Sequence, residues 1–414
     1  MPPRPFSELT LLVAVAVAAT VLAVGAGGDD GDQAGQPAGA GAWAGLVGGE
    51  PADVELGQRV IVVLKLPSLA DRVRDAGGRA DDRQHRRWTR AAASAQKLFI
   101  SRMTIEGARL QTDLSFTRVL NGFSATIDPR SLAVLERSED VAGVYPVRAA
   151  FPAAVSSAEL SARTVVSSAP VLPGFDGRGV TVALLDTGLD GRHRYLGHRV
   201  RDGIDVVDGD DSTQAEANPE TGELERHGTQ LAGLVAGANG PAGLAGIAPG
   251  ASILPIRVAG WQRDSRGTYS VYARTDQLVA GLERAVDPND DGDTHDAARI
   301  ALLGVAEPFG AFDDSPTAQA VAGALRHDTL VIAPAGNDGP AGVRFGSISG
   351  PGGSKAALTV GAADLRARLQ DVHVVLRAGL GVLLDRRLAL AGPTAPASAS
   401  LRSRRTPSPA RSTT

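Results

Sequence analysis

From residue 179 onward the sequence alternates short apolar runs with segments rich in small, helix-forming residues. Short runs that are apolar throughout are typical of strands buried on both faces, as in a parallel sheet covered by helices on each side. The pattern therefore predicts an α/β domain with a doubly wound parallel sheet, whose site lies at the carboxyl ends of the strands. The runs lie at residues 180–185, 253–258, 330–333 and 357–360.

A second, smaller unit is expected before this domain, at residues 58–150. Asp128 followed by Pro129 is typical of a helix N-cap with proline at the first helical position. Apolar strand-like segments alternate with helical ones around this point, which predicts a small α+β domain of the ferredoxin-like kind. The expected strands lie at residues 60–66, 121–127 and 144–147, and the expected helices at residues 82–110 and from Pro129 onward.

The first 26 residues have the order of a secretory signal, which is a basic residue, an apolar run and then small residues. The apolar run covers residues 9–24, which is shorter than the roughly 20 apolar residues of a membrane-spanning helix. We therefore expect residues 1–26 to be a signal peptide and the protein to be secreted into the extracellular space. An uncleaved membrane anchor is the alternative. Residues 27–57, rich in Gly, Ala and Asp, are expected to be a disordered linker.

Composition excludes several classes of protein. The net charge is −4 over 414 residues, which argues against a nucleic-acid-binding protein, because such proteins carry a basic stripe. The chain has no cysteine, so disulfides and thiolate metal sites are excluded. A chain of this length builds a core large enough to be stable without cross-links.

Three polar residues stand where a parallel sheet would place a site. Asp186 directly follows the first apolar run, His227 opens a helical segment, and Asn337 lies in the turn after a later run. A carboxylate at a strand end can hold a histidine brought there by another element, and an asparagine amide can donate a hydrogen bond to a developing oxyanion. Each residue alone is also compatible with a capping, structural or turn role. Together, in this order, they favour a catalytic site.

The motifs around these residues resemble those of the subtilisin-like serine proteases, and they stand in the chain order of that family. The resemblance covers residues 58–364, and residues 58–150 are similar to the family's inhibitory propeptide. The matching motifs are Asp186-Thr187-Gly188, His227-Gly228-Thr229 and Ala335-Gly336-Asn337, with further similarity at residues 121–124, 243–249 and 354–362.

The resemblance implies a serine endopeptidase precursor that hydrolyses peptide bonds through an Asp-His-Ser triad, with no cofactor needed for the chemistry. Asp186 would orient His227, His227 would act as general base and then general acid, and Asn337 would stabilise the oxyanion. Polypeptides would be the substrates, and the chain's own propeptide would occupy the active-site cleft. After removal of the signal, neither nucleic acid nor membrane would be a partner. Residues 151–171 would be the processing linker, and residues 172–364 a partial catalytic domain.

The family's nucleophile motif, Gly-Thr-Ser-x-Ala-x-Pro, does not occur in the sequence. The nearest match, residues 267–270, has a tyrosine before the serine and precedes Asn337. We therefore expect a chain truncated before its nucleophilic serine, inactive as written. It should also fold poorly, because the missing helix would leave part of the sheet uncovered. The alternative is a non-catalytic secreted protein that acts as a protease inhibitor or as a peptide-binding module.

The end of the sequence supports two further expectations. Residues 365–392 predict a β-hairpin, which would be either the start of an inserted β-rich domain or scrambled sequence. Residues 393–414 are almost entirely Ala, Pro, Ser, Thr and Arg, and such a composition cannot form a core. This tail is expected to be either disordered or the product of a frameshift.

An acidic segment at residues 287–296 resembles the first half of a calcium loop, because acidic and amide side chains alternate before Gly292. The late bidentate glutamate of such loops is absent, since Ala298 occupies its place. The segment predicts either a structural calcium site or a plain acidic surface loop. The candidate ligands are Asp287, Asn289, Asp291, Asp293 and Asp296.

Overall fold

The computed structural model describes most of the chain between residues 51 and 389. The described ranges are 51–153, 174–210, 212–240, 245–338, 348–361, 371–378 and 381–389, the last two as backbone only. The predicted signal at residues 1–26 and the predicted tail at residues 393–414 lie outside them, as do residues 27–50 and residues 154–171 of the two predicted linkers. No helix in the described part of the chain combines the length and apolar character that crossing a membrane needs.

The four apolar runs of the sequence form one six-stranded sheet together with β7 and β11, and every paired strand in it is parallel. This confirms the predicted α/β fold class. The strands lie in the order β14-β13-β11-β6-β8-β7. Their bounds are β6 (Thr181–Asp186), β7 (Ile204–Asp205), β8 (Ser252–Arg257), β11 (Ile300–Leu303), β13 (Leu330–Pro334) and β14 (Ala357–Val360).

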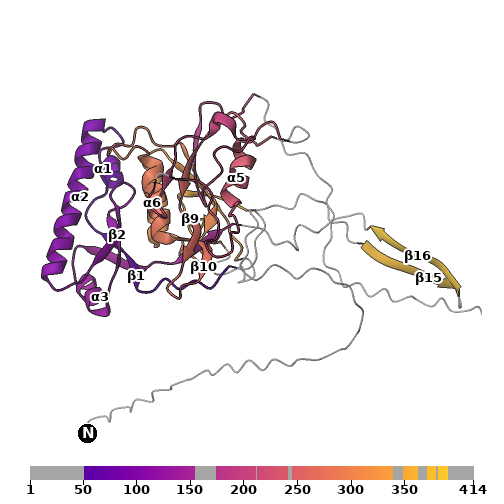
Figure 1. Ribbon diagram of the computed structural model, residues 1–414, viewed down its shortest axis with the longest axis horizontal. Helices are drawn as coiled ribbons and strands as arrows, with labels where there is room; N and C mark the ends of the chain where they lie inside the picture. Colours follow the sequence, from indigo (N-terminus) through magenta and orange to yellow (C-terminus); the bar gives the residue numbers. More distant parts are fainter. Residues whose placement is uncertain are drawn as a thin grey trace, which may run out of the picture. The chain divides into compact units, whose positions relative to one another are not determined.

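Helices cover both faces of this sheet, and α5 and α6 are labelled in Figure 1. Strand β6 shows which helices each face contacts. Val182 and Leu184 belong to a cluster with residues of α5 (His227–Ala236). The alternate residues, Ala183 and Leu185, belong to the cluster that contains α6 (Thr275–Val286) and α7 (Pro316–Leu325). Successive side chains of a strand point to opposite faces, so residues 182–185 of β6, all apolar, are buried on both sides.

The N-terminal unit has a four-stranded antiparallel sheet in the order β2-β3-β1-β4. The order of its elements is strand, helices, two strands, helix and strand, as in ferredoxin-like folds. The predicted helix over residues 82–110 ends earlier, at Ile105, because Gly107 with φ of +96° stops it. The elements are β1 (Arg59–Leu64), α1 (Leu69–Asp75), α2 (Asp82–Ile105), β2 (Gln111–Phe116), β3 (Gly122–Thr126), α3 (Pro129–Glu136) and β4 (Val141–Pro146).

A third sheet joins the N-terminal unit to the α/β domain. Strand β5 (Ala149–Pro152) pairs antiparallel with β10 (Tyr269–Arg274) on one side and with β12 (Val305–Ala306) on the other. Strand β9 (Ala259–Arg263) completes the order β12-β5-β10-β9. Strand β5 therefore crosses the boundary expected at residues 150–151, where the sequence predicted a linker.

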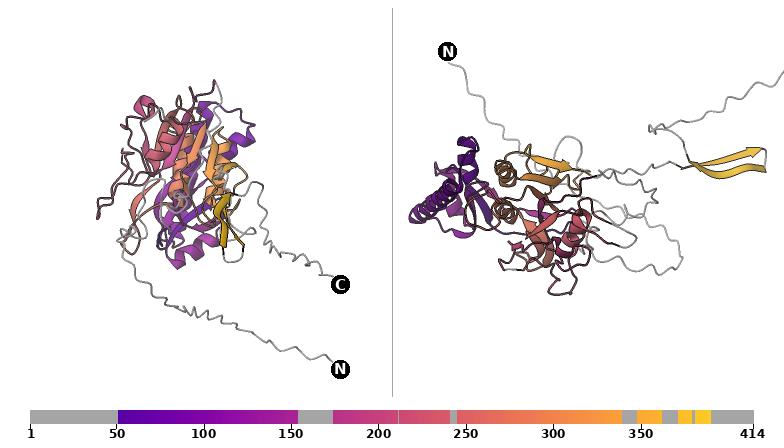
Figure 2. Two further views of the ribbon diagram at one scale, coloured as in Figure 1. Left: turned by 90° about the vertical axis from the view of Figure 1, so that its right-hand side faces the viewer. Right: turned by 90° about the horizontal axis from the view of Figure 1, so that it is seen from above.

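The predicted hairpin near the end of the chain is present. Strands β15 (Asp371–Ala378) and β16 (Gly381–Ala389), drawn in yellow, pair antiparallel with a bulge next to Leu376 (Figure 2). Whether this hairpin begins an inserted domain stays a prediction.

Candidate active site

Asp186 and His227 form a buried pair at the carboxyl end of the parallel sheet. Asp186 is the last residue of β6 and His227 the first of α5. The imidazole Nδ1 lies 2.9 Å from Asp186 Oδ1 and 3.0 Å from Oδ2, and both residues are 1% exposed. The structure therefore brings together two of the three residues predicted for the site.

Asp186 is itself held by its neighbours. Its Oδ1 accepts hydrogen bonds from the backbone N–H and the hydroxyl of Thr187, at 2.6 and 3.1 Å. The Thr187 hydroxyl oxygen in turn accepts from the backbone N–H of Gly228, at 3.1 Å. These bonds tie the Asp-Thr-Gly loop to the first turn of α5, so that the aspartate and the histidine are fixed relative to each other.

Close packing explains two glycines beside the pair. A Cβ on Gly228 would lie 2.1 Å from the backbone oxygen of Gly188, and a Cβ on Gly304 would lie 1.6 Å from Asp186 Oδ2. No larger residue fits at either place without moving α5 or the end of β11. The glycine in the His-Gly-Thr motif thus lets the helix approach the aspartate loop.

Glu225 is a third charged member of the site that the sequence reasoning missed. Its carboxylate accepts the backbone N–H of His227 at 3.0–3.1 Å, and the residue is 1% exposed. Burial raises the pKa of Glu225 to about 6. Its only sequence signal is an acidic residue just before a helix, where a carboxylate can satisfy free N–H groups.

The electrostatic surroundings favour a protonated His227. Burial disfavours the charged imidazolium, but the negative charge and hydrogen bond of Asp186, together with Glu225, outweigh it and raise the pKa of His227 to about 9. Because both Asp186 oxygens accept from Nδ1, the neutral ring carries its proton on Nδ1. The other nitrogen, Nε2, then has a lone pair available as a base.

The end of the N-terminal unit lies against that second nitrogen. The backbone oxygen of Ala153, the residue after β5, is 3.3 Å from His227 Nε2, and the Ala153 N–H donates to Gly304 at 2.8 Å. Phe151 of β5 packs in an apolar cluster with Trp261 and Tyr272. An extended chain therefore runs past the histidine, paired between β10 and β12.

Asn337 lies in the turn after β13, with its side chain exposed. Gly336 before it has φ of +74°, and a Cβ there would lie 1.8 Å from Ser349 Oγ. Glycine is thus required at this turn by both backbone and space. In the sheet, β13 is separated from β6 by the single strand β11, so the turn is at the same edge as Asp186.

The predicted calcium ligands make other bonds in the structure. Asp287 accepts from the Arg118 guanidinium at 2.8 and 2.9 Å and from the backbone N–H of Gly292 at 3.0 Å. Asp291 pairs with Arg86 and accepts the N–H of Asp293. Two arginines of the N-terminal unit, Arg86 and Arg118, thus pair with carboxylates of this acidic loop. Calcium binding by Asp287, Asn289, Asp291, Asp293 and Asp296 stays a prediction.

Comparison with known proteins relates the α/β domain to proteases. The family model described as "Subtilase family" matches residues 177–410. The minor extracellular protease Vpr of Bacillus subtilis is 29% identical over 322 residues, which cover 74% of this chain and 36% of Vpr. Subtilisin BL of Lederbergia lenta is 34% identical over 194 residues, which cover 46% of this chain and 58% of subtilisin BL.

The matched part of this chain thus spans less than two thirds of either relative's length. Among solved structures, the epidermin leader peptide processing serine protease of Staphylococcus aureus aligns with a TM-score of 0.43 at 15% identity. That alignment covers 74% of this chain and 69% of the other.

Proposed function

The chain belongs to the subtilase family, and on that premise we propose that it is the precursor of a secreted serine endopeptidase. The observation that carries the proposal is the buried Asp186–His227 pair, with Nε2 of the histidine facing an extended chain at 3.3 Å. Polypeptides would be its substrates. Secretion rests on the signal-like residues 1–26 and on the extracellular protease Vpr among the relatives.

In a complete protease of this family, His227 would take the proton of the serine hydroxyl on Nε2 as that oxygen attacks the scissile carbonyl. Asp186 stabilises the imidazolium through Nδ1, and Asn337 donates to the oxyanion of the tetrahedral intermediate. His227 then returns the proton to the leaving amine, which leaves an acyl-enzyme that water hydrolyses. Glu225 lies behind His227 on its backbone side, where it supports the same charge without touching substrate.

We also propose that residues 58–150 are the inhibitory propeptide, which β5 extends beyond residue 150. Strand β5 pairs on both sides as a substrate strand would, with Ala153 against the histidine. The backbone N–H groups of Thr117, Arg118 and Val119 all donate to Glu283 of α6. Arg118 also pairs with Asp287. The N-terminal unit is thus held beside His227 and on α6.

Residues 1–414 contain no Gly-Thr-Ser-x-Ala-x-Pro motif, so we propose that they do not form an acyl-enzyme by themselves. The first test is to sequence the gene beyond codon 414 and translate all three frames. A frame that supplies the motif supports the protease. Its absence from every frame would favour the second candidate function, a secreted inhibitor or peptide-binding module. The observation that favours this candidate is strand β5, which pairs with β10 on one side and β12 on the other.

The second test uses the purified full chain and a fluorophosphonate probe, which labels activated serines, with subtilisin BL as positive control. We expect no labelling and no hydrolysis of a fluorogenic peptide by residues 1–414. Labelling that disappears in His227→Gln would show that another serine serves as the nucleophile and would contradict the proposal.

A further inference from the structure

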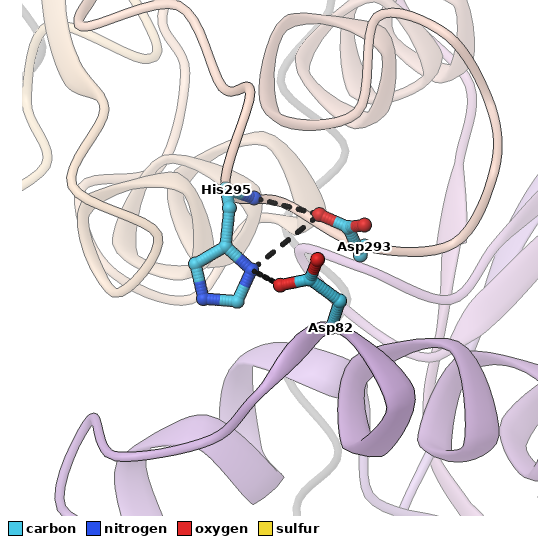
Figure 3. Close-up of side chains that lie close together, drawn as sticks. All are labelled: Asp82, Asp293 and His295. Carbon is cyan, nitrogen blue, oxygen red and sulfur yellow. Dashed lines mark hydrogen bonds and ion pairs between the residues drawn. The ribbon is translucent and has the colours of Figure 1, made fainter.

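Three potential metal ligands lie together where α2 meets the acidic loop (Figure 3). The imidazole Nδ1 of His295 is 2.9 Å from Asp82 Oδ1 and 3.4 Å from Asp293 Oδ1. One ligand atom from each residue lies within 4.8 Å of the other two. Asp82 is in the first turn of α2, so the cluster joins parts of the chain that are distant in sequence.

The distances suit a small tetrahedral cation. Zinc binds nitrogen and carboxylate oxygen at about 2.0–2.2 Å, which puts two tetrahedral ligand atoms about 3.3–3.5 Å apart. The observed separations from His295 Nδ1 are 2.9 and 3.4 Å. An ion could therefore replace the proton between the imidazole and the carboxylates with only a small movement of side chains.

The donor set also selects the kind of metal. One imidazole nitrogen with two carboxylate oxygens is typical of zinc and similar divalent transition metals, whereas calcium takes six to eight oxygens. The side chains of His295 and Asp82 are 50% and 60% exposed. Solvent can therefore reach the cluster and supply a water as the fourth ligand.

Neighbouring groups fix the ligands in place. The ring of His85 stacks on His295, with centroids 4.5 Å apart and an angle of 14° between the planes. Asp293 Oδ1 accepts the backbone N–H of His295 at 3.0 Å, and its other oxygen accepts from Arg86. Hydrogen-bonded carboxylates and rings of fixed orientation are what metal sites have around their ligands.

The side chains around the cluster carry a net negative charge, which favours binding of a cation. Arg86 is the positive charge beside it, and this side chain pairs with both Asp291 and Asp293. Asp82, Asp291 and Asp293 thus bring three negative charges to this place, and Arg86 brings one positive charge. A divalent ion would cancel the remaining negative charge when the imidazole is neutral.

We propose that Asp82, Asp293 and His295 bind a divalent transition-metal cation of the zinc type, which fastens α2 of the N-terminal unit to the acidic loop of the α/β domain. The site adds a metal bridge to the ion pairs that Arg86 and Arg118 already form with this loop. It does not depend on proteolysis, because neither Asp186 nor His227 takes part.

The experiment titrates the metal-free full chain with Zn²⁺ by calorimetry and measures thermal unfolding with and without the ion. We expect one zinc bound per chain and an unfolding midpoint raised by a few degrees. Asp82→Asn and His295→Gln should each weaken zinc binding at least about tenfold. His198→Gln, which changes an exposed histidine of another segment, is the matched control and should leave zinc binding unchanged.

Both test side chains are half exposed or more, so the variants should fold, and their unfolding midpoints without metal check this. Failure of the full chain to bind Zn²⁺, or equal affinity in Asp82→Asn, His295→Gln and the control, would overturn the proposal. A parallel titration with Ca²⁺ separates the two metal hypotheses. Stabilisation by Ca²⁺ that exceeds that by Zn²⁺ and persists in His295→Gln would also overturn it, in favour of the calcium loop at residues 287–296.

Discussion

His227 and His327 are both almost completely buried, at 1% and 6% exposed, but their pKa values move in opposite directions. Burial disfavours the charged ring in both cases. For His327 burial prevails, with His85 and Arg326 nearby acting in the same direction, and the pKa falls to about 4. For His227, Asp186 and Glu225 prevail over burial, and the pKa rises to about 9. The charges placed beside a buried histidine decide its protonation.

The two histidines should therefore give opposite pH dependence of stability. The folded-state pKa of His227 lies above the ordinary value of 6.5. Its protonation therefore adds fully to the free energy of unfolding below pH 6.5, and this stabilisation is lost as pH rises through 9. The folded-state pKa of His327 lies below 6.5, so its folded form loses stability as pH falls from 6.5 through 4. A single substitution at or beside each histidine can remove its share of the pH dependence of the unfolding free energy.

The largest expected effect comes from Asp186→Asn. Without the carboxylate, the main group that opposes the effect of burial is gone, and the pKa of His227 should fall from about 9. Breaking the buried pair should lower the free energy of unfolding by roughly 3 kcal/mol at neutral pH. Since the chain has only seven histidines, NMR titration of the imidazoles can follow His227 directly.

Asp75→Asn, at a largely exposed carboxylate, serves as the control for that substitution and should change stability by no more than about 0.5 kcal/mol. A His227 pKa that stays near 9 in Asp186→Asn would mean that Asp186 is not the main source of the rise.

His327→Gln should have the next largest effect, and on the acid side. In the unsubstituted chain, His327 is buried in its neutral form. As pH falls from 6.5 to 4, the free energy of unfolding should therefore decrease by up to about 3 kcal/mol, since one pKa unit is worth about 1.4 kcal/mol. In the variant, this decrease of the free energy of unfolding with falling pH should be absent, as measured by urea unfolding at several pH values. His198→Gln, at an exposed histidine, should keep it, and identical slopes in both variants would refute the account.

Glu225→Gln tests how much of the His227 shift comes from the second carboxylate. The glutamine oxygen can still accept the His227 N–H, so the helix start is preserved while the charge is removed. The pKa of His227 should fall by less than in Asp186→Asn, with a stability loss of roughly 1 kcal/mol. The same NMR titration measures this fall of the His227 pKa. A fall as large as in Asp186→Asn would contradict the prediction that Asp186 contributes more than Glu225.

The smallest effect is expected for Thr294→Val. The Thr294 hydroxyl lies 2.9 Å from Nδ1 of His327 and 3.2 Å from Nδ1 of His85, so it links the two rings. Its removal should cost about 1 kcal/mol in denaturant unfolding. Thr104→Val on the exposed side of α2 is the control, and equal losses in the two variants would show that the link contributes nothing specific.

Much of the fold and part of the site follow from the sequence alone. The apolar runs predicted the parallel sheet because strands buried on both faces are mostly apolar on both of them. The contact of Asp186 with His227 was expected because one residue ends a strand and the other begins a helix above the same edge. The end of α2 was misplaced, since polar residues continue past Ile105 and only the positive φ of Gly107 marks the stop.

Tertiary structure alone decided what surrounds these residues. Glu225 carries no motif, and its role depends on its burial beside His227. Strand β5 looked like a linker because its partners, β10 and β12, lie more than a hundred residues away. The contacts of Asp82 with the acidic loop are equally distant in sequence. Periodicity and capping report only local structure, whereas charge neutralisation and strand pairing between distant segments exist only once the chain has folded.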